Sequence, residues 1–370
     1  MTSKLFRPLL VVLISFIFIL FLEMILHLFP IKAWESSHHI MDRELLWKGK
    51  PFATGKTHVP TVNKYADIKL NSLGFRSPEI NLEKEKGTYR IVCMGDSSTF
   101  GMEGFEKDIY PSVLQRLLEE KYPEMKIEVV NAGYTGYSSF QGLMLLKLKI
   151  LDLNPDLITI FYGVCDNATP HSASAMTDRK YYENNQSTAG RIREYLHYSK
   201  IYVLLEKGMI AAVSWIKTGK TSPRRDFFQN IQESESGKKT VRRVPLDESE
   251  ENFRNMINTM KSVGIKPILI KHFWLTHDNK DFARTPYHDV MDKIGKETGT
   301  LTIDTSKIFE STYKRLISDL GYYHRMKNKF PETIDAEKDL FNTCYIGNVH
   351  PTAYGHYLIA RELAENMVIK

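Results

Sequence analysis

The chain has 370 residues, of which 42% are hydrophobic and 25% charged, and 50 Lys and Arg against 44 Asp and Glu leave a net charge of +6. These ordinary globular values exclude a largely disordered chain, and the small charge excess does not indicate nucleic-acid binding. Three scattered cysteines also exclude a disulfide scaffold and a zinc site of the CxxC type.

An apolar run near the N-terminus predicts a single-pass membrane anchor. Residues 9–29 are long enough to cross a hydrocarbon core of about 30 Å as one helix, and Lys4 and Arg7 precede them. These basic residues predict that residues 1–8 are cytoplasmic and that the main domain is periplasmic or extracellular. No small-residue cleavage site follows the run, which favours a retained signal anchor over a removed signal peptide. Glu23 is close enough to the far end to reach the membrane interface.

The rest of the chain divides into an extension and one large domain. Residues 31–87 are polar and irregular, and we expect a linker and N-terminal extension that packs on the domain of residues 88–370. In that domain, strand-like and helix-like patterns alternate. Such alternation predicts a mostly parallel sheet with helices on both faces, a three-layer α/β/α fold of the flavodoxin-like kind. The expected strands are 89–94, 127–131, 157–162, 267–271 and 301–304, and the expected helices are 114–122, 143–151, 248–263, 285–298 and 352–368.

An insertion at about residues 170–245 separates the third and fourth strands. It contains a helical stretch at 192–217 and a basic loop, for which a solvated surface is favoured over a patch for an anionic partner. We expect the insertion to shape the mouth of a pocket. Arg243 within it either binds an anionic group of a substrate or forms a structural salt bridge. The basic residues are Arg224, Arg225, Lys238, Lys239, Arg242 and Arg243.

Candidate functional residues follow the predicted strands, at the edge where open parallel sheets bind ligands. Ser97 follows the first strand in a glycine-flanked turn, which would present its hydroxyl beside the N-terminus of the next helix. Backbone N–H groups at such a position favour an oxyanion, although a serine there is also a common helix cap. Gly133 ends the second strand and would let a backbone N–H approach a substrate closely. His350 lies on a loop just before the last helix, opposite the serine.

Together these segments resemble the SGNH/GDSL hydrolase family, from about residue 71 to the end of the chain. The run Gly95-Asp96-Ser97 is similar to the first block of the family, which implies that Ser97 is the nucleophile and its N–H an oxyanion donor. Gly133 resembles the second-block glycine, the second donor, and His350 before Pro351 resembles the general base of the last block. Segments 71–76 (NSLGFR) and 243–245 (RVP) are similar to segments of membrane-anchored members.

Two positions depart from the pattern of the family. Cys165 stands where the third block has the asparagine that supplies a third oxyanion donor, and a thiol is a poor donor. Asn167 lies two residues further on and would face the same way in an extended chain, so it is a candidate substitute. Gly347 stands three residues before His350, where the last block normally has the aspartate that fixes the tautomer of the imidazole.

Three alternatives follow for the orientation of His350. A backbone carbonyl could orient it in a Ser97–His350 dyad, or a carboxylate of the loop just upstream could take the place of the aspartate. In the third alternative the chemistry is lost and the pocket survives as a binding module. The upstream carboxylates are those of Asp335, Glu337 and Asp339. Cys165 and Cys344 both fall on loops of this site, and an oxidising compartment would permit a disulfide between them.

The resemblance implies an extracytoplasmic, membrane-anchored serine ester hydrolase that works through an acyl-Ser97 intermediate without a cofactor. Its location suggests O-acyl groups, in particular O-acetyl groups, of a cell-surface glycan or lipid as the substrate. Two alternatives stay open: an O-acyltransferase that uses the same serine, and a catalytically silent glycan-binding or scaffold protein. The twelve histidines show no ligand spacing such as HExxH, so no metal is expected. Nothing in the sequence indicates a protein partner.

Overall fold

The computed structural model describes residues 3–31, 38–168, 176–218, 241–272, 274–275, 282–334, 344–346 and 350–369. Its centre is a five-stranded sheet of β5 (Thr88–Gly95), β6 (Lys126–Gly133), β7 (Leu157–Phe161), β8 (Lys266–Lys271) and β11 (Leu301–Asp304). The spatial order is β11-β8-β7-β5-β6, and every neighbouring pair is parallel. This is a doubly wound sheet, in which the strand order reverses between β5 and β7.

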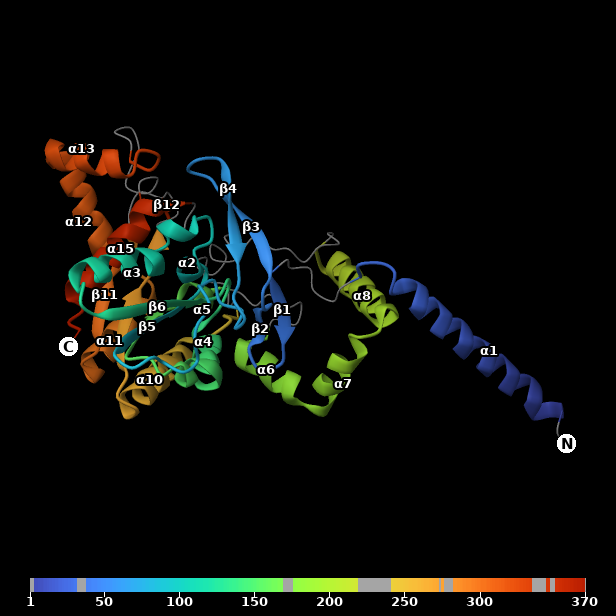
Figure 1. Cartoon of the computed structure of the whole chain (residues 1–370). Helices are drawn as coiled ribbons and strands as arrows, with labels where there is room; N and C mark the ends of the chain where they lie inside the picture. Colours follow the sequence, from blue (N-terminus) through green and yellow to red (C-terminus); the bar gives the residue numbers. More distant parts are fainter. Residues whose placement is uncertain are drawn as a thin grey trace.

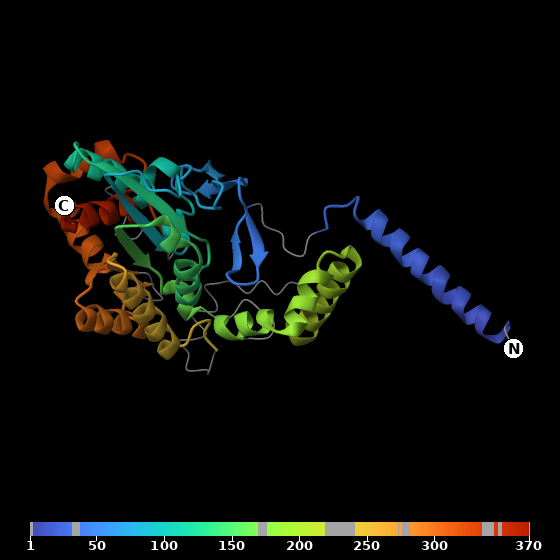
Figure 2. The same ribbon diagram turned by 60° about the horizontal axis from the view of Figure 1, so that its bottom comes forward.

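Helices cover both faces of the sheet, as the two ribbon views show (Figure 1; Figure 2). Successive side chains of a strand point to opposite faces, so Ile91 and Cys93 pack into one core and Val92 and Met94 into the other. This confirms the predicted three-layer α/β/α fold. The first core is closed by α3 (Tyr110–Lys121), α12 (Thr305–Ser318) and α15 (Ala353–Asn366), and the second by α4 (Ser139–Leu145), α10 (Leu246–Ser262) and α11 (Pro286–Thr298).

The expected strands and helices of this domain are present, with shifted ends. The helix expected at 143–151 begins earlier, as α4, and continues as a π-helical turn, η2 (Leu146–Ile150). Two helices after β11, α12 and α13, were not expected. The remaining elements are α2 (Ser97–Phe100), η1 (Glu106–Asp108), η3 (Leu151–Leu153), α5 (Val164–Asn167), α6 (Asp178–Gln186), β9 (Trp274–Leu275), β10 (Phe282–Ala283), α13 (Leu320–Lys329), β12 (Tyr345–Ile346) and β13 (His350–Pro351).

The helical stretch of the insertion is two helices rather than one. These are α7 (Thr188–Leu196) and α8 (Lys200–Thr218). Ser199 stands between them, and its hydroxyl accepts a hydrogen bond from the N–H of Tyr202 at 3.2 Å. A side-chain oxygen at this position starts a new helix, so the continuous apolar periodicity concealed a helix boundary. The basic residues from Arg224 to Lys239 lie outside the described residues.

The N-terminal extension is more regular than its composition indicated. It forms two antiparallel hairpins, β1 (His39–Asp42) with β2 (Leu46–Gly49) and β3 (Thr54–Val59) with β4 (Lys64–Lys69). The expectation of an irregular segment is wrong for these strands. In β3 and β4 the few buried residues alternate with exposed ones, so the apolar content of the two strands is low. The extension is joined to the domain by Trp47, whose indole N–H donates to the carbonyl of Thr135 at 3.0 Å.

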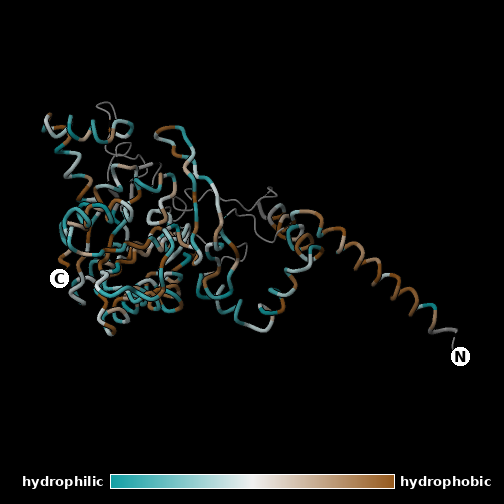
Figure 3. The backbone as a smooth tube through the Cα atoms, viewed as in Figure 1, coloured by the Kyte–Doolittle hydropathy of each residue, from teal (hydrophilic) through white to brown (hydrophobic). Residues whose placement is uncertain are grey.

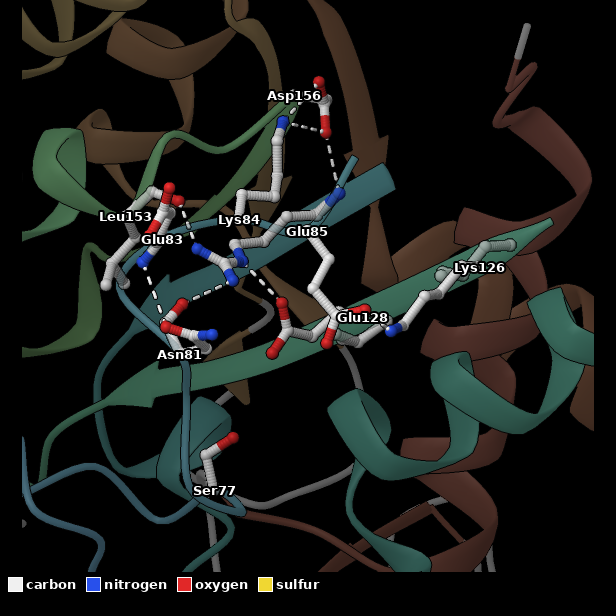
Figure 4. Close-up of polar contacts among 12 residues, drawn as sticks. Ser77, Asn81, Glu83, Lys84, Glu85, Lys126, Glu128, Leu153 and Asp156 are labelled. Carbon is white, nitrogen blue, oxygen red and sulfur yellow. Dashed lines mark hydrogen bonds and ion pairs between the residues drawn. The ribbon is translucent and has the colours of Figure 1, made fainter. Parts of the chain in front are cut away.

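A buried arginine, Arg90, fixes the start of β5, and Figure 4 labels its partners Asn81 and Glu128. The Arg90 guanidinium donates to the carbonyl of Asn81 at 2.7 Å and to the carboxylate of Glu128. Lys84 Nζ lies 2.8 and 2.9 Å from the two carboxylate oxygens of Asp156, which also accepts the backbone N–H of Arg90 at 2.7 Å. These bonds tie the end of the extension and the start of β5 together, at the sheet edge opposite to Ser97.

The N-terminal helix α1 (Ser3–Leu26) projects away from the domain (Figure 1) and is apolar over most of its length (Figure 3). Among the described residues, the segment Phe6–Leu26 is long and apolar enough to cross a membrane. Its side chains make almost no contact with the domain. The direction in which it would cross stays a prediction from Lys4 and Arg7.

One buried histidine connects the two ends of the sheet domain. His356 in α15 is fully buried, and its Nδ1 accepts the backbone N–H of Tyr110 at 3.2 Å. Burial, with smaller effects of the nearby charges on His350 and Arg76, lowers the pKa of His356 to about 3. The native protein therefore keeps this imidazole neutral over the whole physiological range.

We predict that His356 makes the protein less stable in acid. The unfolded chain binds a proton near pH 6.5 that the native state excludes until about pH 3, so stability is full above pH 6.5 and is lost as the pH falls towards 3. The expected slope from this group is about 1.4 kcal/mol per pH unit. In His356→Gln, an amide oxygen can still accept from Tyr110. Urea unfolding between pH 7 and 4 should show a shallower dependence for this variant; an equal slope would contradict the prediction.

Candidate active site

Ser97 lies at the carboxyl edge of the sheet, beside the point where the strand order reverses. It is the first residue of α2, directly after β5 and the N-cap Asp96, whose Oδ1 accepts the N–H of Ser98 at 2.9 Å. A side chain at Gly95 would place its Cβ 2.0 Å from Thr99 Oγ1, so this tight turn requires glycine. Ser97 is partly exposed although Asp96 and Ser98 are buried. Its hydroxyl can therefore be reached from solvent.

His350 meets this serine from the other end of the chain. It begins the short strand β13, which pairs with β12, and Thr352 then caps α15. The Nε2 atom of His350 lies 2.9 Å from Ser97 Oγ. The fold thus brings together the two residues for which the sequence predicted the roles of base and nucleophile.

The other ring nitrogen of His350 contacts a carboxylate that sequence reasoning missed. His350 Nδ1 lies 2.8 Å from Glu103 Oε2, so the imidazole bridges a hydroxyl and a carboxylate. Glu103 is six residues after Ser97 on the loop that follows α2. The positions that the sequence analysis considered for orienting His350 lie outside the described residues. They are Gly347, Asp335, Glu337 and Asp339. The sequence feature that could have identified Glu103 is an acidic residue between two glycines, Gly101 and Gly104, shortly after the nucleophile.

Glu103 is held in an uncommon backbone conformation. Its φ is +62°, in the left-handed region, which costs a non-glycine residue about 1–3 kcal/mol. Its N–H donates to Thr57 Oγ1 of β3 at 3.1 Å. Arg76, which is almost fully buried, donates to the carbonyls of Gly101 at 2.6 Å and Gly104 at 3.0 Å. The N-terminal extension therefore holds the loop that carries Glu103 in place. Arg76, the arginine of the 71–76 segment, makes two of these three hydrogen bonds.

A second histidine–carboxylate pair lies behind the nucleophile. His272 Nε2 is 3.0 Å from Asp96 Oδ2, both side chains are buried, and the imidazole stacks on Phe161 at 3.9 Å between ring centroids. Since the other oxygen of Asp96 caps α2, this pair fixes the turn from beneath. Among the described residues, no cluster of three or more His, Cys, Asp and Glu side chains is arranged to hold a metal ion.

Two backbone N–H groups were predicted to bind the oxyanion. The N–H of Ser97 is at the first position of a helix, where the helix itself offers no acceptor. The N–H of Gly133 donates to Asn131 Oδ1 at 3.0 Å. A Cβ at Gly133 would come within 2.4 Å of the backbone nitrogen of Phe100. This glycine is thus required for close packing of β6 against α2, and its role as a donor stays a prediction.

The third predicted donor does not have the geometry from which it was inferred. Residues 164–167 form the short helix α5 rather than extended chain, and helical residues two apart point in nearly opposite directions. Asn167 Oδ1 accepts a hydrogen bond from Arg242. Cys165 is buried, and this burial raises the pKa of its thiol well above the usual range. Asn167 as a donor remains a prediction. Cys165 and Cys344 are free thiols, so the disulfide between them is absent from this structure.

Arg243 has a structural role. It is completely buried, and its Nη2 donates to Asp178 Oδ2 at 2.7 Å and to Gln141 Oε1 at 2.9 Å. Ser138, the N-cap of α4, donates to the same Asp178 oxygen at 2.7 Å. The arginine therefore joins the insertion to α4, and the salt bridge is the alternative that the structure supports.

Comparisons with known proteins match the chain to one family of hydrolases. The sequence model of the GDSL-like lipase/acylhydrolase family matches residues 93–358, which include both Ser97 and His350. No curated relative matches the chain. A solved acetylxylan esterase from Geobacillus stearothermophilus is 18% identical, with 77% of this chain and 98% of that chain covered and a TM-score of 0.41. A G-D-S-L family protein from Desulfitobacterium hafniense is 15% identical over 75% and 99% of the two chains, with a TM-score of 0.39.

We predict that Gly133→Ala destabilises the protein. The added methyl group would overlap the backbone of α2 and force β6 away from it, at a cost of about 1–3 kcal/mol. Gly208→Ala is the matched control, because a Cβ at this exposed helical glycine meets nothing within 4 Å. Thermal unfolding should show a lower Tm for Gly133→Ala alone. Equal Tm values for wild type and both variants would contradict the packing role of Gly133.

Proposed function

The chain belongs to the GDSL-like lipase/acylhydrolase family and is an esterase of the SGNH/GDSL type; we propose that it uses Ser97, His350 and Glu103 as a catalytic triad. We further propose that it is membrane-anchored and extracytoplasmic and removes acyl groups, in particular acetyl groups, from a cell-surface glycan or lipid. The observation that carries the assignment is the chain of contacts from Ser97 Oγ through His350 to Glu103, at 2.9 and 2.8 Å.

Proton transfer through His350 is the first step of the proposed reaction. His350 Nε2 accepts the proton of Ser97 Oγ while this oxygen attacks the acyl carbonyl, and the imidazole becomes a cation. Glu103 accepts the hydrogen bond of Nδ1–H, which holds the reactive tautomer and stabilises the cation that forms. Glu103 therefore takes the role that Gly347 cannot fill.

Breakdown of the tetrahedral intermediate completes the cycle. Its negative oxygen is bound by the N–H of Ser97, and the N–H of Gly133 joins it if Asn131 releases its hydrogen bond. Asn167 remains the candidate third donor. His350 then gives its proton to the leaving alcohol, and the acyl group stays on Ser97. A water molecule, deprotonated by the same imidazole, attacks the acyl-enzyme, and His350 returns this proton to Ser97 Oγ as the acid is released.

The strained backbone at Glu103 favours an active enzyme over a silent binding module. A left-handed backbone conformation costs a glutamate about 1–3 kcal/mol. Hydrogen bonds of Arg76 and Thr57 hold the loop of Glu103 in this conformation. The Glu103 carboxylate contacts a nitrogen of the one imidazole that also reaches the serine. A protein that only binds a glycan has no need of this arrangement.

The location and the substrate class rest on the N-terminal helix. Phe6–Leu26 is long enough to span a membrane. Lys4 precedes this segment and Arg7 lies at its start, which favours a domain outside the cytoplasm. Acylated envelope polymers and lipids are the esters within reach of a domain held there. Acyl transfer to a sugar would need the same triad, and no contact among the described residues favours it over hydrolysis.

We predict that Glu103→Gln lowers kcat by about 10²–10⁴-fold with little change in KM. The amide is isosteric but cannot stabilise the imidazolium, and it permits the wrong tautomer. Glu106→Gln, three residues further along the same loop and exposed, is the matched control and should stay within a few-fold of wild type. Hydrolysis of 4-nitrophenyl acetate measures both. An unchanged kcat for Glu103→Gln would exclude this residue from the triad.

We also predict that Ser97 carries the acyl group. Wild type should react with a fluorophosphonate at neutral pH and release acetate from an acetylated oligosaccharide, whereas Ser97→Ala should do neither. Mass spectrometry of the labelled peptide identifies the modified residue.

Two outcomes would contradict hydrolysis by this serine. Absence of label on wild-type Ser97 would identify a silent binding module. Appearance of newly acylated sugar instead of free acetate, when an acceptor oligosaccharide is added, would identify an acyltransferase.

A further inference from the structure

The helix α8 is attached to the end of the N-terminal helix by a partly buried carboxylate cap. Glu23, in the last turn of α1, accepts the backbone N–H groups of Lys200 at 2.5 Å and Ile201 at 3.0 Å. Lys200 Nζ donates to the carbonyl of Ile31 at 2.7 Å. The carboxylate thereby satisfies the open N–H groups that start α8. The first turn of α8 consequently lies at the level where α1 would leave a membrane.

The direction of α8 suits a helix that lies on that membrane. In the view of Figure 2, α8 runs across the axis of α1 rather than along it. If α1 crosses the membrane, α8 therefore runs along the surface. Glu206 and Lys207 stand in the middle of α8, and among the described helices α1 alone meets the length and hydropathy needed for spanning. A helix of this kind lies at an interface instead of crossing it.

One side of α8 leaves large apolar side chains uncovered. Leu205, Met209 and Ile216 are 68%, 63% and 76% exposed. Their spacing of four and seven residues places them on a single helical face. Polar contacts occupy a different side: Glu206 lies 2.7 Å from Arg193 of α7 and 2.8 Å from His197. An apolar stripe of this size on a soluble domain marks a surface that contacts another phase or molecule.

The surrounding residues favour lipid as the occupant. Trp215 of α8, next to Ile216, and Tyr195 and Tyr198, in and just after the last turn of α7, are all more than half exposed. Aromatic side chains of this kind prefer the membrane–water interface. Residues 188–218 contain five Lys and Arg against two Glu, a net charge of +3. Such a charge attracts anionic headgroups and disfavours the pairing of this face with a second copy of itself.

We propose that α8 and the end of α7 lie on the non-cytoplasmic surface of the membrane that α1 crosses, with Leu205, Met209 and Ile216 inserted among anionic lipids. This rests on the proposed membrane anchor but goes beyond it, since an anchor alone requires only α1. The pair of helices α7 and α8 would fix the height and the rotation of the esterase domain above the lipid. A flexible linker after α1 would fix neither.

The test places a fluorescent label on the exposed face of α8 in the full chain. Leu205→Cys and Met209→Cys carry the label, in vesicles of neutral and anionic phospholipid; the native cysteines are buried. Val263→Cys, an exposed apolar position at the end of α10, is the matched control. We expect lipids brominated near the headgroup to quench the labels at 205 and 209, with a several-fold lower quenching constant for aqueous iodide than at 263.

A label at Ile17→Cys in α1 separates the proposal from the anchor on which it rests. Quenching at 17 by lipids brominated near the ends of the acyl chains, with full iodide quenching at 205 and 209, overturns the proposal for α8 and leaves the anchor intact. Absence of lipid quenching at 17 overturns both. Protection of 205 and 209 from iodide and from brominated lipid alike, with chemical cross-linking into dimers, identifies a second copy of the chain as the occupant and also overturns the proposal.

Discussion

The imidazole of His350 is the connection on which the site depends. It contacts two side chains of one short segment, Ser97 at the start of α2, at 2.9 Å, and Glu103 on the loop that follows α2, at 2.8 Å. Because both partners belong to the segment that follows β5, local backbone geometry sets their separation. Only the histidine comes from a distant part of the chain. The pairing of β13 with β12 and the capped start of α15 position its side chain. The doubly wound sheet makes this possible by placing β5 in its interior, beside the reversal of strand order.

The N-terminal extension is part of this site rather than a tether to it. Arg76 and Thr57 hold the loop of Glu103, and Trp47 joins the first hairpin to the loop after β6. Each contact pairs a backbone polar group with a side chain in a buried or partly buried setting, where loss of the partner is costly. The extension and the active site are consequently linked through the packed contacts of these side chains.

The two departures from the family pattern, Cys165 and Gly347, do not by themselves indicate a loss of activity. An imidazole needs a carboxylate within hydrogen-bond reach of Nδ1, and it makes no difference to the chemistry where in the chain that carboxylate originates. Position 347 is a glycine, whereas Glu103, six residues after Ser97, places a carboxylate 2.8 Å from Nδ1 of His350. Cys165 is different, because its burial as a neutral thiol offers no equivalent donor.

The amino-acid order alone determined the strands, the layers, the apolar N-terminal helix and the pair Ser97 and His350. Periodic burial and strand-end motifs are local, so they leave a trace that can be read without coordinates. Glu103, the two hairpins, the break between α7 and α8 and the helical turn at Asn167 were decided by tertiary structure. Glu103 meets partners 46 and 247 positions away, and Glu23 caps a helix 177 residues later. Contacts of that range depend on how the chain packs, and no sequence period records them.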